Sequence, residues 1–371
     1  MPYLVRENLF IGNISDAADV LQNGRGGLGI THVLSVLSSP SIEFFSEWKS
    51  SVVIPSKLIK KVYVSDWEDN GDDEGDDRSR IREIRRSCLP PEKVLYVLER
   101  SGKEFEIERM GVGVRDMESE NLLDYLDVCL EFIERGRKEG CILVHCYAGV
   151  SRSAAVITAY LMRSERLSHE DALDSLKQSY ESVCPNDGFL DQLKMFEEMG
   201  YVVDRSSSVY KRFRLMILSE SYNRGEKIDS SKFGVDPGVP AEVSPVAHSS
   251  PTEGNKRVPA YRCRKCRRVV ALMENVVDHF PGEGETSFAW NKRRGWNPNR
   301  NSEESECSSI FIEPLRWMKA VEEGALEGKL QCAHCDGRLG SFNWSGIQCS
   351  CGSWITPAFQ LHKSRVDIST A

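Results

Sequence analysis

The sequence predicts an α/β domain followed by a small metal-binding domain, and three features of the chain lead to this prediction. Up to about residue 205, short apolar runs with strand character alternate with helical patterns, which is typical of a layered α/β structure. The run at 141–146 is mostly apolar, like a buried central strand. Seven of the twelve cysteines lie between residues 263 and 351, after the alternation has ended.

The predicted elements follow from hydrophobic periodicity. Leu122, Leu126 and Ile133 fall on one side of a helix, together with their neighbours Leu123 and Leu130. An irregular insertion is predicted at about 39–107, and its run at 66–77 has eight acidic residues in twelve. We interpret that run as a solvated segment, with a docking site for a basic partner as the alternative. Strands are predicted at 9–12, 31–37, 109–114 and 141–146, and helices at 122–137, 151–162, 169–180 and 187–200.

Composition divides the chain of 371 residues into three parts: an α/β domain at 1–205, an extension and flexible linker at 206–259, and a cysteine-rich domain at 260–371. The net charge is −8, but from Lys256 onward 17 Lys and Arg face 13 Asp and Glu. No apolar run reaches the roughly 18 residues of a membrane span. The first residues lack a secretory signal pattern, so we expect a reducing compartment, where cysteines serve as ligands or nucleophiles.

The segment from His145 to Ser153 predicts a nucleophilic cysteine at the junction of a strand and a helix. A tight turn follows Cys146, and Gly149 allows its backbone to curl. Backbone amides in such a turn form an anion site at the helix N-terminus, where a cysteine is a thiolate at neutral pH. Arg152 offers a planar fork to two phosphate oxygens, and Ser153 can donate to the departing sulfur. The predicted phosphate-binding residues are Tyr147, Ala148, Gly149, Val150, Ser151 and Arg152.

A general acid is needed to protonate the leaving oxygen, and two aspartates follow strand-like runs. Asp116 lies 30 residues before Cys146, which is the length of one loop, one helix and one strand, so both can share one edge of the sheet. Asp66 opens the acidic run and is the alternative. We therefore predict Asp116 as the acid.

The cysteine-rich region predicts two structural zinc sites with four protein ligands each. One site is assigned Cys332, Cys335, Cys349 and Cys351. The other is assigned Cys263, Cys266, Cys307 and His279, with His362 as an alternative to His279. A cross-braced pairing of the cysteine turns is the less economical arrangement. Metal binding is expected to supply much of the folding free energy of this unit.

The pattern His145-Cys146-x5-Arg152-Ser153 resembles the signature of the protein tyrosine phosphatase superfamily, and its dual-specificity branch most of all. The resemblance covers roughly residues 1–200. It implies a sheet flanked by helices, a phosphocysteine intermediate, a phosphoprotein substrate and no metal at the catalytic centre. The segment after Asp116 is similar to that branch as well. The segment with Asn186 and Phe189 also matches the family, and we interpret both residues as structural.

Together with the zinc-ribbon-like C-terminal domain, these motifs resemble the zinc-binding dual-specificity phosphatases of the human DUSP-twelve and yeast Yvh-one type. That resemblance implies a role in maturing the large ribosomal subunit, and we expect a cytoplasmic and nuclear location. A contact with RNA or a pre-ribosomal particle is expected through basic residues, with solubilising charge as the alternative. Other open functions are an assembly factor with dispensable catalysis and a lipid or RNA phosphatase. The basic residues are Arg262, Arg264, Lys265, Arg267 and Arg268.

Overall fold

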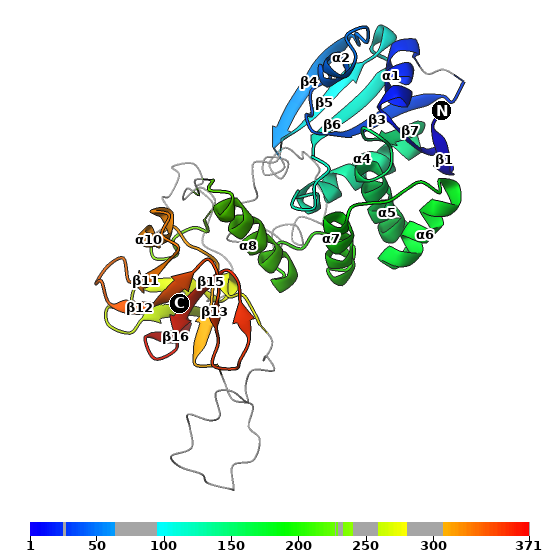
Figure 1. The fold of residues 1–371 in the computed structure, drawn as a ribbon. Coiled ribbons are helices and arrows are strands. Elements are labelled where there is room, and N and C mark those ends of the chain that lie inside the picture. The colour runs from blue at the N-terminus through cyan, green and yellow to red at the C-terminus, as the bar shows by residue number, and fades with distance from the viewer. Residues whose placement is uncertain are drawn as a thin grey trace, which may run out of the picture. The chain divides into compact units, whose positions relative to one another are not determined.

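A computed structural model describes residues 1–24, 27–63, 95–226, 228, 233–239, 259–279 and 307–370 (Figure 1). These residues form two compact units, one ending at Asp204 and the other beginning at Arg205. Within the described ranges, no helix is both long enough and apolar enough to cross a membrane.

A seven-stranded mixed sheet forms the centre of the first unit, in the order β1-β2-β7-β3-β6-β5-β4. The four strands β2, β7, β3 and β6 are parallel, and the outer strands pair antiparallel. Parallel strands end at the same edge of a sheet, so the segments that follow β6 and β7 lie at one edge. The strands are β1 (Tyr3–Arg6), β2 (Leu9–Gly12), β3 (Ile30–Leu37), β4 (Ser56–Tyr63), β5 (Leu95–Ser101), β6 (Ile107–Gly113) and β7 (Cys141–His145).

Helices cover both faces of this sheet (Figure 1). On one face, α1 and α2 bury Leu21 and Phe45 against Val33 and Leu143. On the other face, α4 and α5 lie on the sheet, and α6 and α7 pack against α5. Asn13 and Asn186 cap α1 and α7 by accepting hydrogen bonds from amides of the first turn. The helices are α1 (Ile14–Asn23), α2 (Phe44–Trp48), the 3-10 helix η2 (Lys103–Phe105), α4 (Leu123–Glu139), α5 (Arg152–Glu165), α6 (His169–Ser179) and α7 (Asp187–Glu198).

The predicted α/β fold class is confirmed, and each predicted strand and helix of the first unit has a counterpart within a few residues. The expected irregular insertion at 39–107 is wrong in its extent, because α2, β4, β5 and η2 lie within it. Strand β5 is part of the sheet because it pairs with β6 from Tyr96 to Ser101. The acidic run at 66–77 lies outside the described residues.

The second unit is built from short antiparallel strands in sheets of four, three and two strands (orders β10-β15-β12-β11, β16-β8-β9 and β13-β14). The elements are α8 (Ser208–Asn223), β8 (Pro259–Cys263), β9 (Val269–Leu272), the 3-10 helix η4 (Met273–Asn275), β10 (Ser309–Phe311), α10 (Lys319–Glu322), β11 (Glu327–Gln331), β12 (Arg338–Asn343), β13 (Ile347–Gln348), β14 (Trp354–Ile355), β15 (Ala358–His362) and β16 (Val366–Thr370).

The structure differs from the predicted linker at 206–259, because its first part belongs to the core of the second unit. Helix α8 buries Leu215 and Leu218, and Phe233 joins the same apolar cluster as Trp344. Tyr222 of α8 stacks on the Trp344 ring, with ring centroids 4.8 Å apart. The apolar side chains of α8 are therefore satisfied by packing within the unit, and residues 240–258 lie outside the described part.

Candidate active site and metal sites

Cys146 follows β7 directly, and only 1% of the residue is exposed. The Gly149 amide donates a hydrogen bond to its Sγ at 3.2 Å, and the Ser153 hydroxyl donates another at 3.3 Å. Gly149 has a φ of +79°, and a Cβ there would lie 2.8 Å from the Gly12 carbonyl oxygen, so this turn requires glycine. Both donors stabilise negative charge on the sulfur.

Arg152 is the first residue of α5 and is buried beside this turn. Its Nη1 donates to the Val114 carbonyl oxygen at 3.2 Å, and its Nε lies 3.7 Å from Oδ2 of Asp116. Within the described residues Nε makes no hydrogen bond. A buried guanidinium with an unused donor is suited to bind a phosphate oxygen. Of the other predicted phosphate-binding residues, Tyr147 and Ala148 are exposed in the turn.

Asp116 lies in the loop between β6 and α4, residues 114–122, which we call the acid loop. The Ser151 hydroxyl donates to its Oδ1 at 2.7 Å, and the Asn186 side-chain amide donates to the same oxygen at 2.9 Å. The structure therefore brings Asp116 to the turn that follows Cys146. The alternative acid, Asp66, lies outside the described residues.

Helix α7 holds the acid loop, which the sequence interpretation of Asn186 and Phe189 as structural residues did not reveal. Gln192 Oε1 accepts from the Leu122 amide at 2.8 Å, and its Nε2 donates to the Glu120 carbonyl oxygen at 2.8 Å. A Cβ on Gly188 would lie 2.0 Å from the Glu118 carbonyl oxygen. The segment with Asn186 thus sets the position of the acid loop, and a glycine so close to the helix start is the sequence signal that could have indicated this contact.

His145 is fully buried behind the turn. Its Nδ1 lies 3.1 Å from the Cys146 carbonyl oxygen, and its Nε2 lies 2.7 Å from the Ser35 hydroxyl. Burial lowers the pKa of His145 to about 3, with Arg109 and Arg152 adding to the effect, so the imidazole is neutral. A neutral, fully bonded imidazole holds the turn in place and is not an acid or a base for the substrate.

The structure brings together all eight predicted metal ligands in two clusters. Within each cluster the four ligand atoms lie within 4.8 Å of one another. Four thiolates, or three thiolates with one imidazole, are donor sets that suit structural zinc. His362 lies elsewhere, with its Nδ1 3.3 Å from the Ser309 hydroxyl oxygen. The clusters are Cys263, Cys266, Cys332 and Cys335, and His279, Cys307, Cys349 and Cys351.

The predicted grouping of these ligands was wrong, since the cross-braced alternative is the one observed. Each Cys-x2-Cys turn joins two antiparallel strands, the first between β8 and β9 and the second between β11 and β12. The two turns face each other, with Sγ–Sγ distances of 3.7 Å between Cys263 and Cys335 and 3.6 Å between Cys266 and Cys332. The packing of the two hairpins against each other, rather than nearness in sequence, decides which turns share a cluster.

Three of the five basic residues around the first cysteine turn form ion pairs within the second unit. Arg264 and Arg267 form ion pairs with Asp367, and Arg268 forms one with Asp236. Lys265 directs its Nζ to the Cys335 carbonyl oxygen at 3.5 Å. The charge available to an anionic partner here is smaller than the sequence suggested, and the basic stretch at 291–300 lies outside the described residues.

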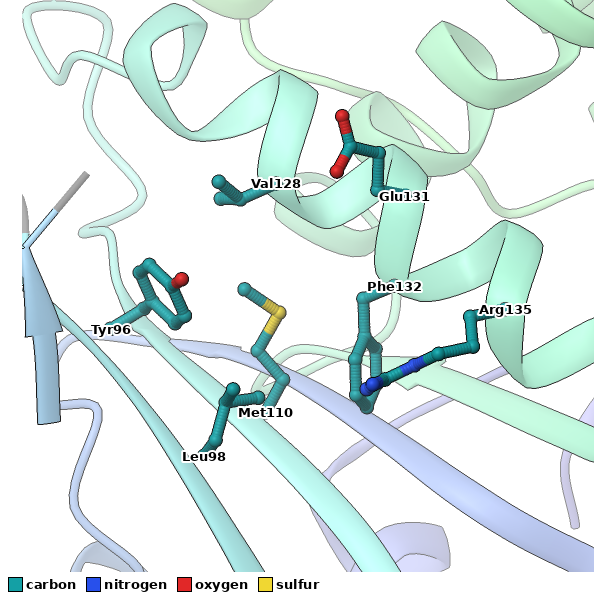
Figure 2. A pocket seen from close by; sticks show the side chains of 7 residues that line it. All are labelled: Tyr96, Leu98, Met110, Val128, Glu131, Phe132 and Arg135. Carbon is teal, nitrogen blue, oxygen red and sulfur yellow. The ribbon is translucent and has the colours of Figure 1, made fainter. Parts of the chain in front are cut away.

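A cavity of about 240 Å³ lies between strands β5 and β6 and helix α4 (Figure 2). The ring of Phe132 and the side chain of Met110 line its mostly apolar wall, and the Arg135 guanidinium lies over the Phe132 ring. None of the predicted catalytic or phosphate-binding residues is among those lining it. The lining residues are Tyr96, Leu98, Met110, Val128, Glu131, Phe132 and Arg135.

Comparison with known proteins agrees with the motif at Cys146. Residues 92–199 match the family model described as dual specificity phosphatase, catalytic domain. The chain is 41% identical over 263 residues to dual specificity protein phosphatase 12 of Homo sapiens, and the alignment covers 71% of this chain and 74% of the human protein. It is 31% identical to tyrosine-protein phosphatase YVH1 of Saccharomyces cerevisiae, covering 97% of this chain and 89% of that one. A crystal structure of the Yvh1 phosphatase domain from Chaetomium thermophilum is 22% identical with a TM-score of 0.32, covering 53% of this chain and 93% of that one.

Proposed function

The chain belongs to the dual-specificity protein phosphatase family and is a cysteine-dependent phosphatase, and we propose that it hydrolyses phosphotyrosine and phosphoserine or phosphothreonine through a phosphocysteine intermediate on Cys146. The observation that supports this most is the convergence of three groups on one turn: the Cys146 sulfur with its two donors, the Arg152 guanidinium and the Asp116 carboxyl.

The first step is the transfer of the phosphoryl group to sulfur. The phosphate oxygens bind the amides of the turn and Arg152, whose Nε has no other hydrogen bond among the described residues. The Cys146 thiolate attacks phosphorus, so that an S–P bond forms as the ester P–O bond breaks. Asp116 supplies the proton to the leaving oxygen, which departs as a tyrosine, serine or threonine hydroxyl.

The second step returns the enzyme to its starting state. The Asp116 carboxylate takes a proton from water as the water oxygen attacks phosphorus, and the P–S bond breaks. The sulfur leaves as a thiolate, and the Ser153 hydroxyl at 3.3 Å stabilises it. Inorganic phosphate is released and Asp116 carries the proton for the next cycle.

Peptides carrying phosphotyrosine or phosphothreonine test this function with the full chain and two variants. Cys146→Ser is expected to abolish release of phosphate, because the hydroxyl is a weak nucleophile at neutral pH. Asp116→Asn is expected to reduce kcat by about 100-fold or more, a usual value for loss of an acid. Equal activity in the wild type and Cys146→Ser would refute the proposed mechanism.

For the second unit we propose two bound zinc ions with a structural role, and a tethering role toward a ribonucleoprotein, specifically the maturing large ribosomal subunit. The four-thiolate and three-thiolate-plus-imidazole donor sets support zinc. The 31% identity to the yeast tyrosine-protein phosphatase YVH1 over 89% of that protein supports a shared architecture. This role requires the protein to be in the cytoplasm and the nucleus.

Sedimentation of cell extracts tests the tether. The full chain and Cys146→Ser are both expected to travel with pre-ribosomal particles of the large subunit, whereas Cys332→Ser, which loses a zinc ligand, is expected to stay unbound. Normal ribosomal RNA processing in cells with only Cys146→Ser would show that the tether acts without catalysis. Wild-type protein found only in the fractions of unbound protein, and not with pre-ribosomal particles, would refute the tether.

A further inference from the structure

Four polar side chains cross the central sheet on one face, from β5 through β6 and β3 to β7. Glu99 of β5 lies directly opposite Arg109 of β6, and Ser35 of β3 lies directly opposite His145 of β7. All four residues are buried. Arg109 and Glu99 form an ion pair, Arg109 Nε donates to Ser35 Oγ at 2.9 Å, and Ser35 Oγ lies 2.7 Å from His145 Nε2. The chain ends where His145 Nδ1 lies 3.1 Å from the Cys146 carbonyl oxygen.

The direction of these hydrogen bonds follows from the chemistry of Arg109 and of the Cys146 carbonyl at the other end. A guanidinium can only donate hydrogen bonds, so Ser35 Oγ accepts from Arg109. The hydroxyl hydrogen of Ser35 is not used by Arg109 and can be donated to His145 Nε2, which lies 2.7 Å from Oγ. The imidazole is neutral, so its single proton resides on Nδ1 and is donated to the Cys146 carbonyl oxygen. The opposite tautomer would place two lone pairs, on Nδ1 and on that carbonyl, 3.1 Å apart.

Arg109 is fixed so firmly that it can impose this order. Its Nη1 also donates to the Pro40 carbonyl oxygen at 3.2 Å, and its guanidinium lies 5.6 Å from the centre of the Phe45 ring. The same ring lies 5.7 Å from the His145 ring, so Phe45 packs against both Arg109 and His145. Gly111 makes room for this arrangement, since a Cβ there would lie 2.2 Å from the Pro40 oxygen and 3.0 Å from Arg109 Nη2.

We propose that Arg109, held by Glu99, is a positioning residue of the phosphatase reaction: acting through Ser35, it fixes the proton of His145 on Nδ1 and thereby holds the Cys146 carbonyl oxygen away from the phosphate site. With this carbonyl held, the Gly149 amide of the turn is directed at the sulfur. The inference rests on the proposed function, because it concerns the same turn. Among these four side chains, His145 makes the contact with the turn.

Nitrogen NMR of the full-length protein labelled at histidine tests the tautomer directly. The signal of His145, identified by its loss in His145→Gln, is expected to show a protonated Nδ1 and an unprotonated Nε2. A protonated Nε2 in the wild type would overturn the proposal, whatever the variants do. In Ser35→Ala, the preference for the Nδ1 proton is expected to weaken.

Kinetics of Ser35 variants test the consequence for the reaction. Ser35→Ala is expected to lower kcat/KM for a phosphotyrosine peptide between about 10- and 100-fold, the range seen when a supporting hydrogen bond is removed. The acidic limb of the pH profile of kcat/KM is expected to shift to higher pH. The pH at which iodoacetamide alkylates Cys146 at half its maximal rate is expected to shift in the same direction. The charged groups near the turn and the Ser35 hydroxyl, namely Arg109, Glu99, Arg152 and Asp116, are unchanged in this variant. Ser35→Thr, which keeps the hydroxyl, is expected to restore both.

Ser101→Ala is the matched control, because it removes another fully buried hydroxyl of the same sheet that has no hydrogen-bond partner among the described residues. It is expected to match the wild type in kcat/KM and in pH profile. Wild-type kinetics in Ser35→Ala, or an equal loss in Ser101→Ala, would overturn the inference while leaving the proposed function intact. A wild-type protein with no activity on the phosphotyrosine peptide would instead refute the proposed function.

Discussion

Gly188→Ala tests whether helix α7 positions the acid loop. Gly188 is the second residue of α7, and a Cβ there would lie 2.0 Å from the Glu118 carbonyl oxygen and 2.5 Å from its carbonyl carbon. Real Cβ atoms essentially never come closer than 3.0 Å to such atoms, so helix and loop must separate by about 1 Å. Alanine otherwise favours a helix, so the variant reports this contact and not a loss of helix propensity.

The expected effect follows from where Glu118 lies, two residues after Asp116 in the same loop. A displacement of 1 Å at a reacting group costs about 100-fold in rate. The loss is expected only for substrates that need the acid. Phenyl phosphate, whose leaving oxygen must be protonated, is expected to lose about 100-fold in kcat, whereas difluoromethylumbelliferyl phosphate, which releases a stable anion, is expected to keep most of its rate.

The assay compares these two substrates in the wild type, Gly188→Ala and Gly27→Ala. Gly27 is the control because a Cβ there meets no atom within 4 Å. Asp116→Asn is expected to show the same selectivity as Gly188→Ala. Equal losses on both substrates, or no loss on phenyl phosphate, would refute the view that α7 places the acid.

Three further predictions concern metal, pH and buried charge. Cys332→Ser is expected to reduce bound zinc from two ions to one, counted by native mass spectrometry, and to lower the melting temperature of the second unit; an unchanged zinc count would contradict the first cluster. Burial lowers the pKa of His145 to about 3, so between pH 6.5 and 3 the unfolded chain binds a proton that the folded chain does not. The free energy of unfolding, measured in urea, is therefore expected to fall as the pH drops through this range. The fall is expected to be less steep in His145→Gln. Glu99→Ala leaves Arg109 buried and unpaired, and it is expected to lower the free energy of unfolding of the first unit, measured in urea, by about 3–5 kcal/mol. The double variant Glu99→Ala with Arg109→Met is expected to regain much of this stability. A loss of less than about 1 kcal/mol in Glu99→Ala would argue against a desolvated ion pair.

The part of the site that sequence could predict is the part encoded locally. The strand, turn and helix around Cys146 occupy consecutive residues, so the pattern of an apolar run, a glycine and a helical stretch was sufficient. The position of Asp116 near the turn could be predicted because one loop, one helix and one strand span a fixed length. The contacts of Asp116 with Asn186 and Ser151 join segments 70 and 35 residues away, and no local pattern records which residues meet.

The errors have the same physical origin. Strands β4 and β5 were missed because residues 64–94 separate them, so no hairpin pattern connects two strands that pair in the sheet. Helix α8 was assigned to a linker because serine-rich flanks surround it, and its buried side chains include Lys211 and Arg214 as well as apolar residues. The metal ligands were identified individually from their residue type and spacing, but their grouping depends on which strand pairs face each other.

The interleaving of the two metal clusters has a consequence for how ions are acquired. Residues 259–279 supply Cys263 and Cys266 to one cluster and His279 to the other, and residues 307–370 complete both. Binding of a first ion would join residues up to 72 positions apart in the chain. The entropic cost of bringing together the ligands of the second cluster would then be smaller. We therefore expect metal loading to be cooperative, because each of the two segments supplies ligands to both clusters.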